Sequence, residues 1–299
     1  MTELPGGLHG AHRRSDAEAH LGRYGLRVAL AGGLLHAPWW GVVVDARRAL
    51  DVRTRAAAAT LALGPDAVVC GLTAAELWGC GAAAMPATHV MVPTSSTARR
   101  RRGLVVHRGG HDEDVVHVGD LPVLALDRVL ADLLCDGRTA PRVALGITDQ
   151  ALLQAEDDGP QLRKRVATRL DTRADRRGTR RAAGLLDLAT GRARSPAESH
   201  LLLVLVELGL PRPMVNWPVV SPWGRTLREL DLAWPELMIA VEYQGYAVHE
   251  GREAEDEARA EDLRRRGWIV VFADAADLRD PRALEARLRA AFARRGHVW

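Results

Sequence analysis

Lysine is almost absent from this chain of 299 residues. Lys164 is the only one, although lysine and arginine together number 41. Nearly every positive charge is therefore an arginine, and the abundance of alanine, glycine and arginine indicates a composition bias. A reaction that needs a lysine beside the carboxylates of the C-terminal third has no local candidate.

Cysteine is also scarce. Cys70, Cys80 and Cys135 are an odd number and include no Cys-x-x-Cys pair. This pattern argues against a disulfide framework and against a zinc site. We expect a reduced, cytoplasmic compartment, because free thiols persist there.

Long apolar runs are missing as well. The most apolar window, Val28–Val44, is interrupted by Gly32, Gly33, His36 and Pro38. It is also shorter than the about 20 residues that span a bilayer. No N-terminal stretch combines a basic start, an apolar middle and a small-residue cleavage site. We expect this window to lie in a core, and we expect no membrane partner.

The remaining composition is typical of a globular protein, with 47% hydrophobic and 26% charged residues. The length is sufficient for two domains with separate cores. A net charge of +3 makes the chain mildly basic. This balance is compatible with a nucleic-acid partner but does not establish one.

Residues 1–136 read as a mixed α/β domain. Thr73 and Glu76 have the spacing of a capping box, which predicts a helix start. Periodicity and turn signals predict the other elements. These are two short helices within 16–35, a strand at Gly41–Val44, a helix at Val52–Leu63, strands at His89–Val92 and Leu104–His107, and a helix at Leu124–Leu134.

Residues 137–194 read as a basic helical linker. Residues 163–181 include nine basic residues and only two acids, Asp171 and Asp175. Such a run is either a solvated helix face or a surface that contacts phosphates, because clustered arginines release counterions from nucleic acid. The candidates for DNA binding are Arg163, Lys164, Arg165, Arg176, Arg177, Arg180 and Arg181.

Residues 195–299 read as an α-β-β-β-α-β-α domain. Ser195-Pro196-Ala197-Glu198 is a strong helix start, with Ser at the cap and Pro at the first helical position. The remaining predicted elements are strands Met214–Val220, Leu227–Trp234 and Leu237–Tyr243, a helix at Arg252–Arg266, a strand at Trp268–Phe272 and a helix at Arg282–Arg295.

Two acids fall late in neighbouring strands of this domain. Asp231 and Glu242 lie among Leu, Val and Ala, where a carboxylate is costly unless a cation pairs with it. Two carboxylates with nearby carbonyl groups form the oxygen-rich environment that Mg²⁺ prefers. Such a metal polarises a phosphoryl oxygen and lowers the pKa of bound water.

The string Asp231…Glu242-Tyr243-Gln244 resembles the PD-(D/E)XK nuclease pattern. The closer resemblance, over about 80 residues, is to the DUF559 branch, which is similar to very-short-patch-repair endonucleases. The matching positions are Glu198, Asp231-Leu232-Ala233-Trp234, Val241-Glu242-Tyr243-Gln244-Gly245, His249, Asp256, Arg259, Leu263 and Gly267-Trp268.

This resemblance implies a restriction-endonuclease-like α-β-β-β-α-β core and an Mg²⁺- or Mn²⁺-dependent DNA endonuclease or nickase with no small-molecule cofactor. Asp231 and Glu242 would bind the metal, and Glu198 would assist through water. Gln244 would position the attacking water or the phosphate, and His249 would be an auxiliary acid/base. Gln244 stands where the family has its lysine, so the chain departs from the pattern there.

Each of these residues also has a structural explanation. Asp231 can form an ion pair with an arginine such as Arg228, and Glu242 can be paired in the same way. Glu198 can be a first-turn acid favoured by the helix dipole. His249 can be a bystander in a loop, and Asp256 can form a helix salt bridge with Arg259, which is also a candidate DNA contact.

The N-terminal region resembles AbiEi-like antitoxins. The resemblance rests on Cys70–Gly79, His89–Pro93, Leu121–Val123 and Leu126–Leu133. It implies a winged-helix start at residues 16–44 and a cognate toxin as partner. Three hypotheses follow: a nuclease, a DNA-binding antitoxin or transcriptional regulator of a type IV toxin–antitoxin system with an inactive nuclease fold, and a module that neutralises a toxin by binding it.

Overall fold

The computed structural model describes residues 4, 6–110, 112–221, 223–245 and 261–298. The chain folds into two compact units, each of mixed α/β structure, so the predicted α/β class is confirmed. The N-terminal unit comprises Met1–Thr139 and Leu162–Ala182, and the C-terminal unit comprises Ala140–Gln161 and Ala183–Trp299. The segment predicted as a linker is thus divided between the two units.

A small antiparallel sheet opens the N-terminal unit, in the strand order β1-β3-β2. Its elements are β1 (Ala11–Arg13), α1 (Arg14–Ala31), β2 (Leu35–His36) and β3 (Val42–Asp45). Regular helix geometry in α1 is broken at Gly22, which has φ 69° and ψ 162°. Glycine adopts this conformation without steric cost. Two short helical segments result, as predicted for residues 16–35.

A second sheet forms the core of this unit, in the order β6-β5-β4-β8-β7. Its strands are β4 (Val68–Val69), β5 (Thr88–Val92), β6 (Leu104–Arg108), β7 (Val115–Val118) and β8 (Leu121–Leu124), and its helices are α2 (Val52–Leu63), α3 (Gly71–Leu77) and α4 (Leu126–Cys135). Helix α2 packs against β1 and β3 as well as β5. One helix therefore holds the two sheets of this unit together.

The predicted capping box at Thr73 and Glu76 is wrong. Helix α3 begins at Gly71, and no side chain caps it. Because the helix starts two residues before Thr73, the Thr73 hydroxyl lies inside its first turn, where it accepts the His89 N–H at 2.9 Å. Glu76 instead pairs with Arg55 at 3.0 Å.

The basic segment, defined as residues 163–181, lies mostly in α6 (Gly159–Thr172) and α7 (Thr179–Leu188). Two of its arginines join a charge network around α4. The ion pairs of this network are Arg128–Asp114 (2.6 Å), Arg128–Asp132 (2.8 Å), Arg169–Asp114 (2.8 Å), Arg169–Asp127 (2.5 Å) and Arg173–Asp132 (2.6 Å). Burial raises the pKa of Asp114, but the bonds from Arg169 and Arg128 outweigh it and hold that pKa below its usual value.

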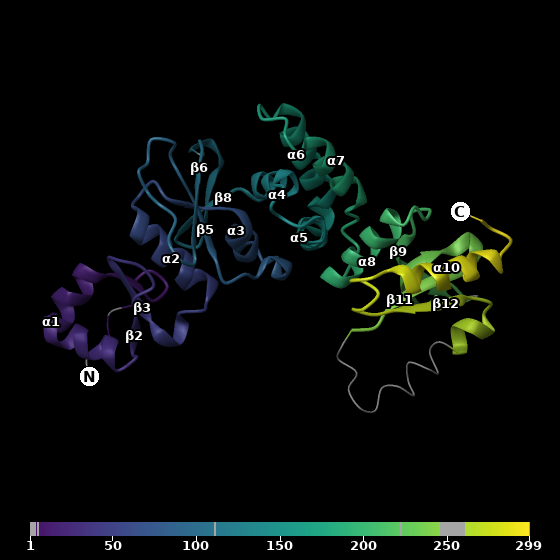
Figure 1. Ribbon diagram of the computed structural model, residues 1–299, viewed down its shortest axis with the longest axis horizontal. Helices are drawn as coiled ribbons and strands as arrows, with labels where there is room; N and C mark the ends of the chain where they lie inside the picture. Colours follow the sequence, from purple (N-terminus) through teal and green to yellow (C-terminus); the bar gives the residue numbers. More distant parts are fainter. Residues whose placement is uncertain (1–3, 5, 111, 222, 246–260, 299) are drawn as a thin grey trace. The chain divides into compact units, whose positions relative to one another are not determined.

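The C-terminal unit is built on a four-stranded sheet with the strand order β12-β11-β10-β9. Figure 1 labels β9, β11 and β12 of this sheet. Strand β12 runs parallel to β11, and the other neighbours are antiparallel. Its elements are α5 (Pro141–Gln154), α8 (Pro196–Glu207), β9 (Met214–Val220), β10 (Thr226–Trp234), β11 (Ile239–Tyr243), β12 (Ile269–Ala273) and α10 (Arg282–Ala293). Of the predicted helix 252–266, residues 261–265 are described and are helical.

The two faces of this sheet are buried in separate clusters. Leu232 and Val241 pack with apolar residues of α8 and α10. Ala233 and Ala240 belong to the opposite cluster, which Leu263 and Trp268 also join. Side chains alternate along a strand, so Glu242 falls on the side of Ala240. In β10, Leu230 belongs to the second cluster and Leu232 to the first, so Asp231 stands where the alternation is interrupted. None of the described helices has both the length and the apolar character needed to cross a membrane.

A buried carboxylate of α5 binds both α8 and the loop before it. Asp149 of α5 is fully buried. Its oxygens accept the Thr190 N–H at 2.6 Å, the Gly191 N–H at 2.9 Å and the Ser199 hydroxyl at 2.8 Å. Burial raises the pKa of Asp149, while these hydrogen bonds oppose the shift. Asp149 therefore joins α5, the loop before α8 and α8 itself.

Replacing Asp149 with alanine leaves these donors without their partner. We expect the free energy of unfolding to fall by about 2–3 kcal/mol, because buried donors that lose their acceptor carry a desolvation cost. Chemical denaturation followed by tryptophan fluorescence measures it. Asp157→Ala, an exposed change in the same unit, serves as the control and should stay within about 0.5 kcal/mol of wild type. Equal midpoints for the two variants would contradict the anchoring role of Asp149.

Candidate functional site

Asp231 and Glu242 meet where the pairing of β10 and β11 stops. The register runs from Trp234↔Ile239 to Leu232↔Val241. At the next pair, Asp231 and Glu242, side-chain carboxylates take the place of the main-chain carbonyls as hydrogen-bond acceptors. Glu242 Oε1 accepts the Asp231 N–H at 3.1 Å, and Asp231 Oδ2 accepts the Tyr243 N–H at 2.8 Å. The two carboxylates, called the carboxylate pair below, are thus held side by side by the opposite strand.

Glu198 is held by the N-terminus of α8. Ser195 caps this helix, as predicted, and its hydroxyl donates to Glu198 Oε1 at 2.9 Å while accepting the Glu198 N–H at 3.2 Å. Glu198 Oε2 accepts the Arg194 N–H at 2.8 Å. The structural explanation of Glu198 as a first-turn acid therefore applies. Its carboxylate nevertheless reaches the same pocket as Asp231.

Asn216 of β9 binds Glu198 and stands opposite Asp231 in the sheet. Its φ of +49° is unusual for a residue other than glycine, although Asn tolerates this region better than most. The side-chain amide donates to Glu198 Oε2 at 3.1 Å and to the Arg192 carbonyl at 2.6 Å. In the β9–β10 register Asn216 falls opposite Asp231, between the pairs Leu230↔Trp217 and Leu232↔Val215. Sequence reasoning did not identify it, because a single Asn in a strand carries no signal.

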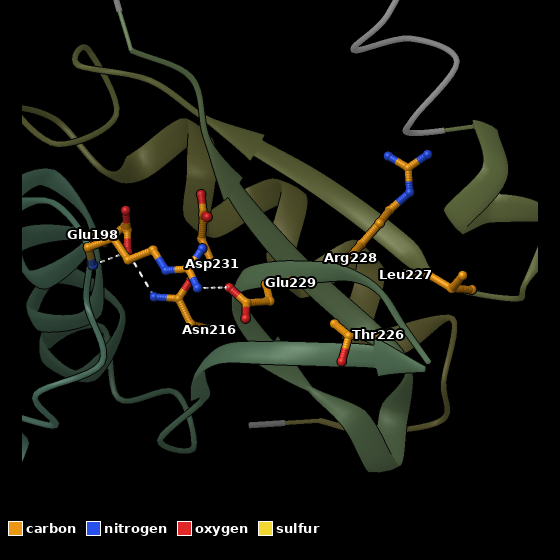
Figure 2. A pocket seen from close by; sticks show the side chains of 8 residues that line it. Glu198, Asn216, Thr226, Leu227, Arg228, Glu229 and Asp231 are labelled. Carbon is orange, nitrogen blue, oxygen red and sulfur yellow. Dashed lines mark hydrogen bonds and ion pairs between the residues drawn. The ribbon is translucent and has the colours of Figure 1, made fainter. Parts of the chain in front are cut away.

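A pocket of about 350 Å³ opens between α8 and the β9–β10 strands. In Figure 2 the side chains of Glu198, Asn216, Glu229 and Asp231 lie around it, whereas Arg228 points away. The residues that line the pocket are Arg194, Glu198, Asn216, Thr226, Leu227, Arg228, Glu229 and Asp231. Two of the predicted site residues, Glu198 and Asp231, therefore share one pocket. Glu242 is not a lining residue, and its carboxylate binds the Asp231 N–H next to the pocket.

Two ion pairs flank this pocket. Arg194 forms one with Glu229, which stands two residues before Asp231 in β10. Arg228, which the sequence offered as a partner for Asp231, instead lies 3.7 Å from Asp262. Arg194 was not identified from the sequence either, because its partner is distant along the chain.

Gln244 is exposed and follows β11, and its N–H donates to the Ala273 carbonyl at 2.7 Å. His249, Asp256 and Arg259 lie outside the described residues. Within the described ranges, no group of three or more His, Cys, Asp or Glu side chains is arranged to hold a metal ion. A cation at the carboxylate pair would have two protein carboxylates, with waters and carbonyls completing the coordination. Mg²⁺ is commonly bound in this way.

Several arginines of the basic segment bind groups of their own unit. Arg181 donates to the carbonyls of Leu134 and Asp136 at the end of α4, at 3.1 and 2.7 Å. Arg177 pairs with Asp175 at 2.8 Å, and Arg176 donates to carbonyls at the end of α6. Of the other predicted DNA contacts, Lys164, Arg165 and Arg180 are exposed and Arg163 is half-buried.

A different set of arginines presents more open charge. Arg99–Arg102, called the arginine run below, are four consecutive exposed residues in the loop between β5 and β6. Among the described residues, no carboxylate forms an ion pair with them. The indole N–H of Trp39 donates to the Arg102 carbonyl at 3.0 Å, which places the run beside the β2–β3 turn. Trp40 in that turn is 87% exposed. Four adjacent arginines were a signal that sequence reasoning missed.

Two proteins of Mycobacterium tuberculosis are similar to this chain. The uncharacterized proteins MT2308 (strain CDC 1551) and Rv2248 (strain H37Rv) are each 32% identical to it over 272 residues. The matched region covers 89% of this chain and 95% of each relative, so the similarity includes both units. No protein-family model matches the chain.

The conformation and the contacts of Asn216 can be separated by two substitutions. Asn216→Gly keeps the positive φ accessible but loses both amide bonds, so we expect a cost of about 1–2 kcal/mol in unfolding free energy. Asn216→Ala adds the strain of a Cβ in this region, about 1 kcal/mol more. Chemical denaturation measures both variants. An unchanged stability in Asn216→Gly would show that the bond to Glu198 does not hold the pocket.

Proposed function

The chain belongs to the family of the uncharacterized mycobacterial proteins MT2308 and Rv2248, and we propose that it is a DNA endonuclease or nickase that depends on Mg²⁺ or Mn²⁺. The observation that carries the proposal is the carboxylate pair at the end of the β10–β11 pairing. Two acids converging from adjacent strands in a mostly apolar sheet suit a divalent cation.

The topology of the C-terminal unit supports a PD-(D/E)XK-type core. Helix α8 is followed by the antiparallel strands β9, β10 and β11, and β12 then adds parallel to β11. This arrangement agrees with the resemblance to the DUF559 and very-short-patch-repair-like endonucleases. It puts Glu198 at the start of the helix and the carboxylate pair on the two central strands.

The residues in and next to the pocket fit the proposed chemistry. Asp231 and Glu242 would hold the cation, whose contribution is to polarise a phosphoryl oxygen and to acidify a bound water. Glu198, oriented by Asn216 and the α8 cap, would accept a hydrogen bond from water in the pocket. Gln244 is exposed, and its amide can orient water or phosphate but carries no charge and cannot act as a base.

A second candidate function is that of a DNA-binding antitoxin or regulator with a cognate toxin as partner. The arginine run and the exposed Trp40 favour it, since guanidinium groups bind phosphates and an aromatic ring can stack on a base. The two helical segments of α1 and the β2–β3 hairpin suit a winged helix, with Tyr24 and Arg27 exposed on the second segment. In this candidate the carboxylate pair is a structural remnant.

Neutralising the carboxylate pair tests the nuclease directly. We expect wild type to nick or cut supercoiled and mismatched DNA with Mg²⁺ or Mn²⁺. Asp231→Asn and Glu242→Gln should each lose at least about 100-fold in rate, because a weakened metal site forfeits transition-state stabilisation. Glu236→Gln, an exposed change in the same hairpin, should cleave like wild type. Metal-dependent cleavage that survives in Asp231→Asn would remove the proposal.

The arginine run can be tested by the salt dependence of DNA binding. Replacing Arg99–Arg102 with glutamine should weaken binding and reduce the slope of log affinity against log salt by about 3–4, since each phosphate contact contributes roughly 0.9. Arg282→Gln removes an exposed arginine of α10 that belongs to neither candidate DNA surface, so it should leave the slope nearly unchanged. Gel shifts from 50 to 200 mM salt measure the slope. Equal slopes for all three proteins would exclude this surface from the interface.

A further inference from the structure

We propose that Arg194 is the phosphate-binding cation of the pocket, and that Glu229 occupies it as an internal counter-ion until a phosphodiester group of DNA displaces it. This inference deepens the proposed function and rests on the same pocket. It answers the question raised by Gln244, because it identifies a positive charge beside the carboxylates where the sequence supplies no lysine.

Among the lining residues, only Arg194 and Arg228 are cationic. The Arg228 guanidinium is directed to Asp262 and points away from Asp231 in Figure 2. The Arg194 guanidinium pairs with Glu229, which lines the pocket together with Asp231. Arg194 is therefore the lining cation whose charge lies beside the carboxylates.

The main chain of Arg194 is fixed, whereas its side chain is not enclosed. Its N–H donates to Glu198 Oε2 at 2.8 Å, directly before the Ser195 cap of α8. The Arg194 side chain is 64% exposed. A guanidinium on an anchored backbone can exchange one anionic partner for another with little rearrangement.

The Glu229 carboxylate binds the Arg194 guanidinium as a phosphate group would. A guanidinium binds carboxylates and phosphates with the same planar arrangement of N–H donors. Because the arginine side chain of this pair is 64% exposed, solvent screens the attraction, and an incoming phosphate can replace the carboxylate. Glu229 also repels that phosphate, because the two groups carry charge of the same sign.

The proposal predicts a gain of function. Glu229→Gln should tighten DNA binding by about 3- to 10-fold, because it releases Arg194 and removes the repulsion. Arg194→Gln should weaken binding by about 10-fold or more, and Arg194→Lys should recover part of that loss because it restores the charge without the planar donors. In the double variant the gain from Glu229→Gln should shrink to about 2-fold, because that gain acts through Arg194.

The experiment measures fluorescence anisotropy of a labelled DNA duplex with the full chain in EDTA, so that no cleavage occurs. Arg225→Gln, an exposed arginine in the β9–β10 turn, and Glu236→Gln are the matched controls. Thermal unfolding confirms that each variant is folded. Weaker or unchanged binding in Glu229→Gln overturns the proposal, and so does a gain of equal size in the Arg194→Gln background.

The result is separable from the fate of the nuclease. If wild type cleaves no DNA but the gain appears and depends on Arg194, the phosphate pocket stands while the nuclease proposal falls. If wild type cleaves DNA and the Arg194 and Glu229 variants bind like wild type, the nuclease stands and Arg194 is not its phosphate-binding cation.

Discussion

The candidate site depends on the exchange of hydrogen bonds between β10 and β11. The strands pair through their main chains from the turn as far as Leu232 and Val241. At the next pair, the Asp231 and Glu242 carboxylates accept N–H groups of the opposite strand. A buried carboxylate needs such donors or a cation. Here the donors fix the position of two acids at the end of the hairpin, which prepares the geometry that a divalent cation would use.

The other side of the pocket is coupled to the stability of the fold. Glu198 Oε1 accepts the Ser195 hydroxyl at the cap of α8, and Glu198 Oε2 accepts the Asn216 amide. Asp149 of α5 binds Ser199 of the same helix. The same bonds that satisfy the helix end therefore orient the pocket. Arg194 extends this arrangement, because its main chain belongs to the cap and its guanidinium belongs to the pocket.

Local sequence patterns predicted many of the helices and strands, but they could not predict contacts between residues that are far apart in the sequence. Alternation placed β9, β10 and β11 within two residues of their bounds, and the Ser195 cap placed the start of α8. The positive φ of Asn216 and the Arg194–Glu229 pair depend on neighbours that only the fold brings together. At Thr73 a local pattern gave a wrong prediction. The helix starts two residues earlier than the capping pattern indicated, and the Thr73 hydroxyl binds β5 instead.

The most direct test of the central claim is the position of a bound metal. A crystal soaked in Mn²⁺ should show an anomalous difference peak about 2.1 Å from a carboxylate oxygen of Asp231 and of Glu242, and the peak should be absent in Asp231→Asn. This result would establish the carboxylate pair as a metal site at the end of the β10–β11 hairpin. A wild-type crystal in which Mn²⁺ binds elsewhere, with both carboxylates bonded only to the opposite strand, would contradict the account.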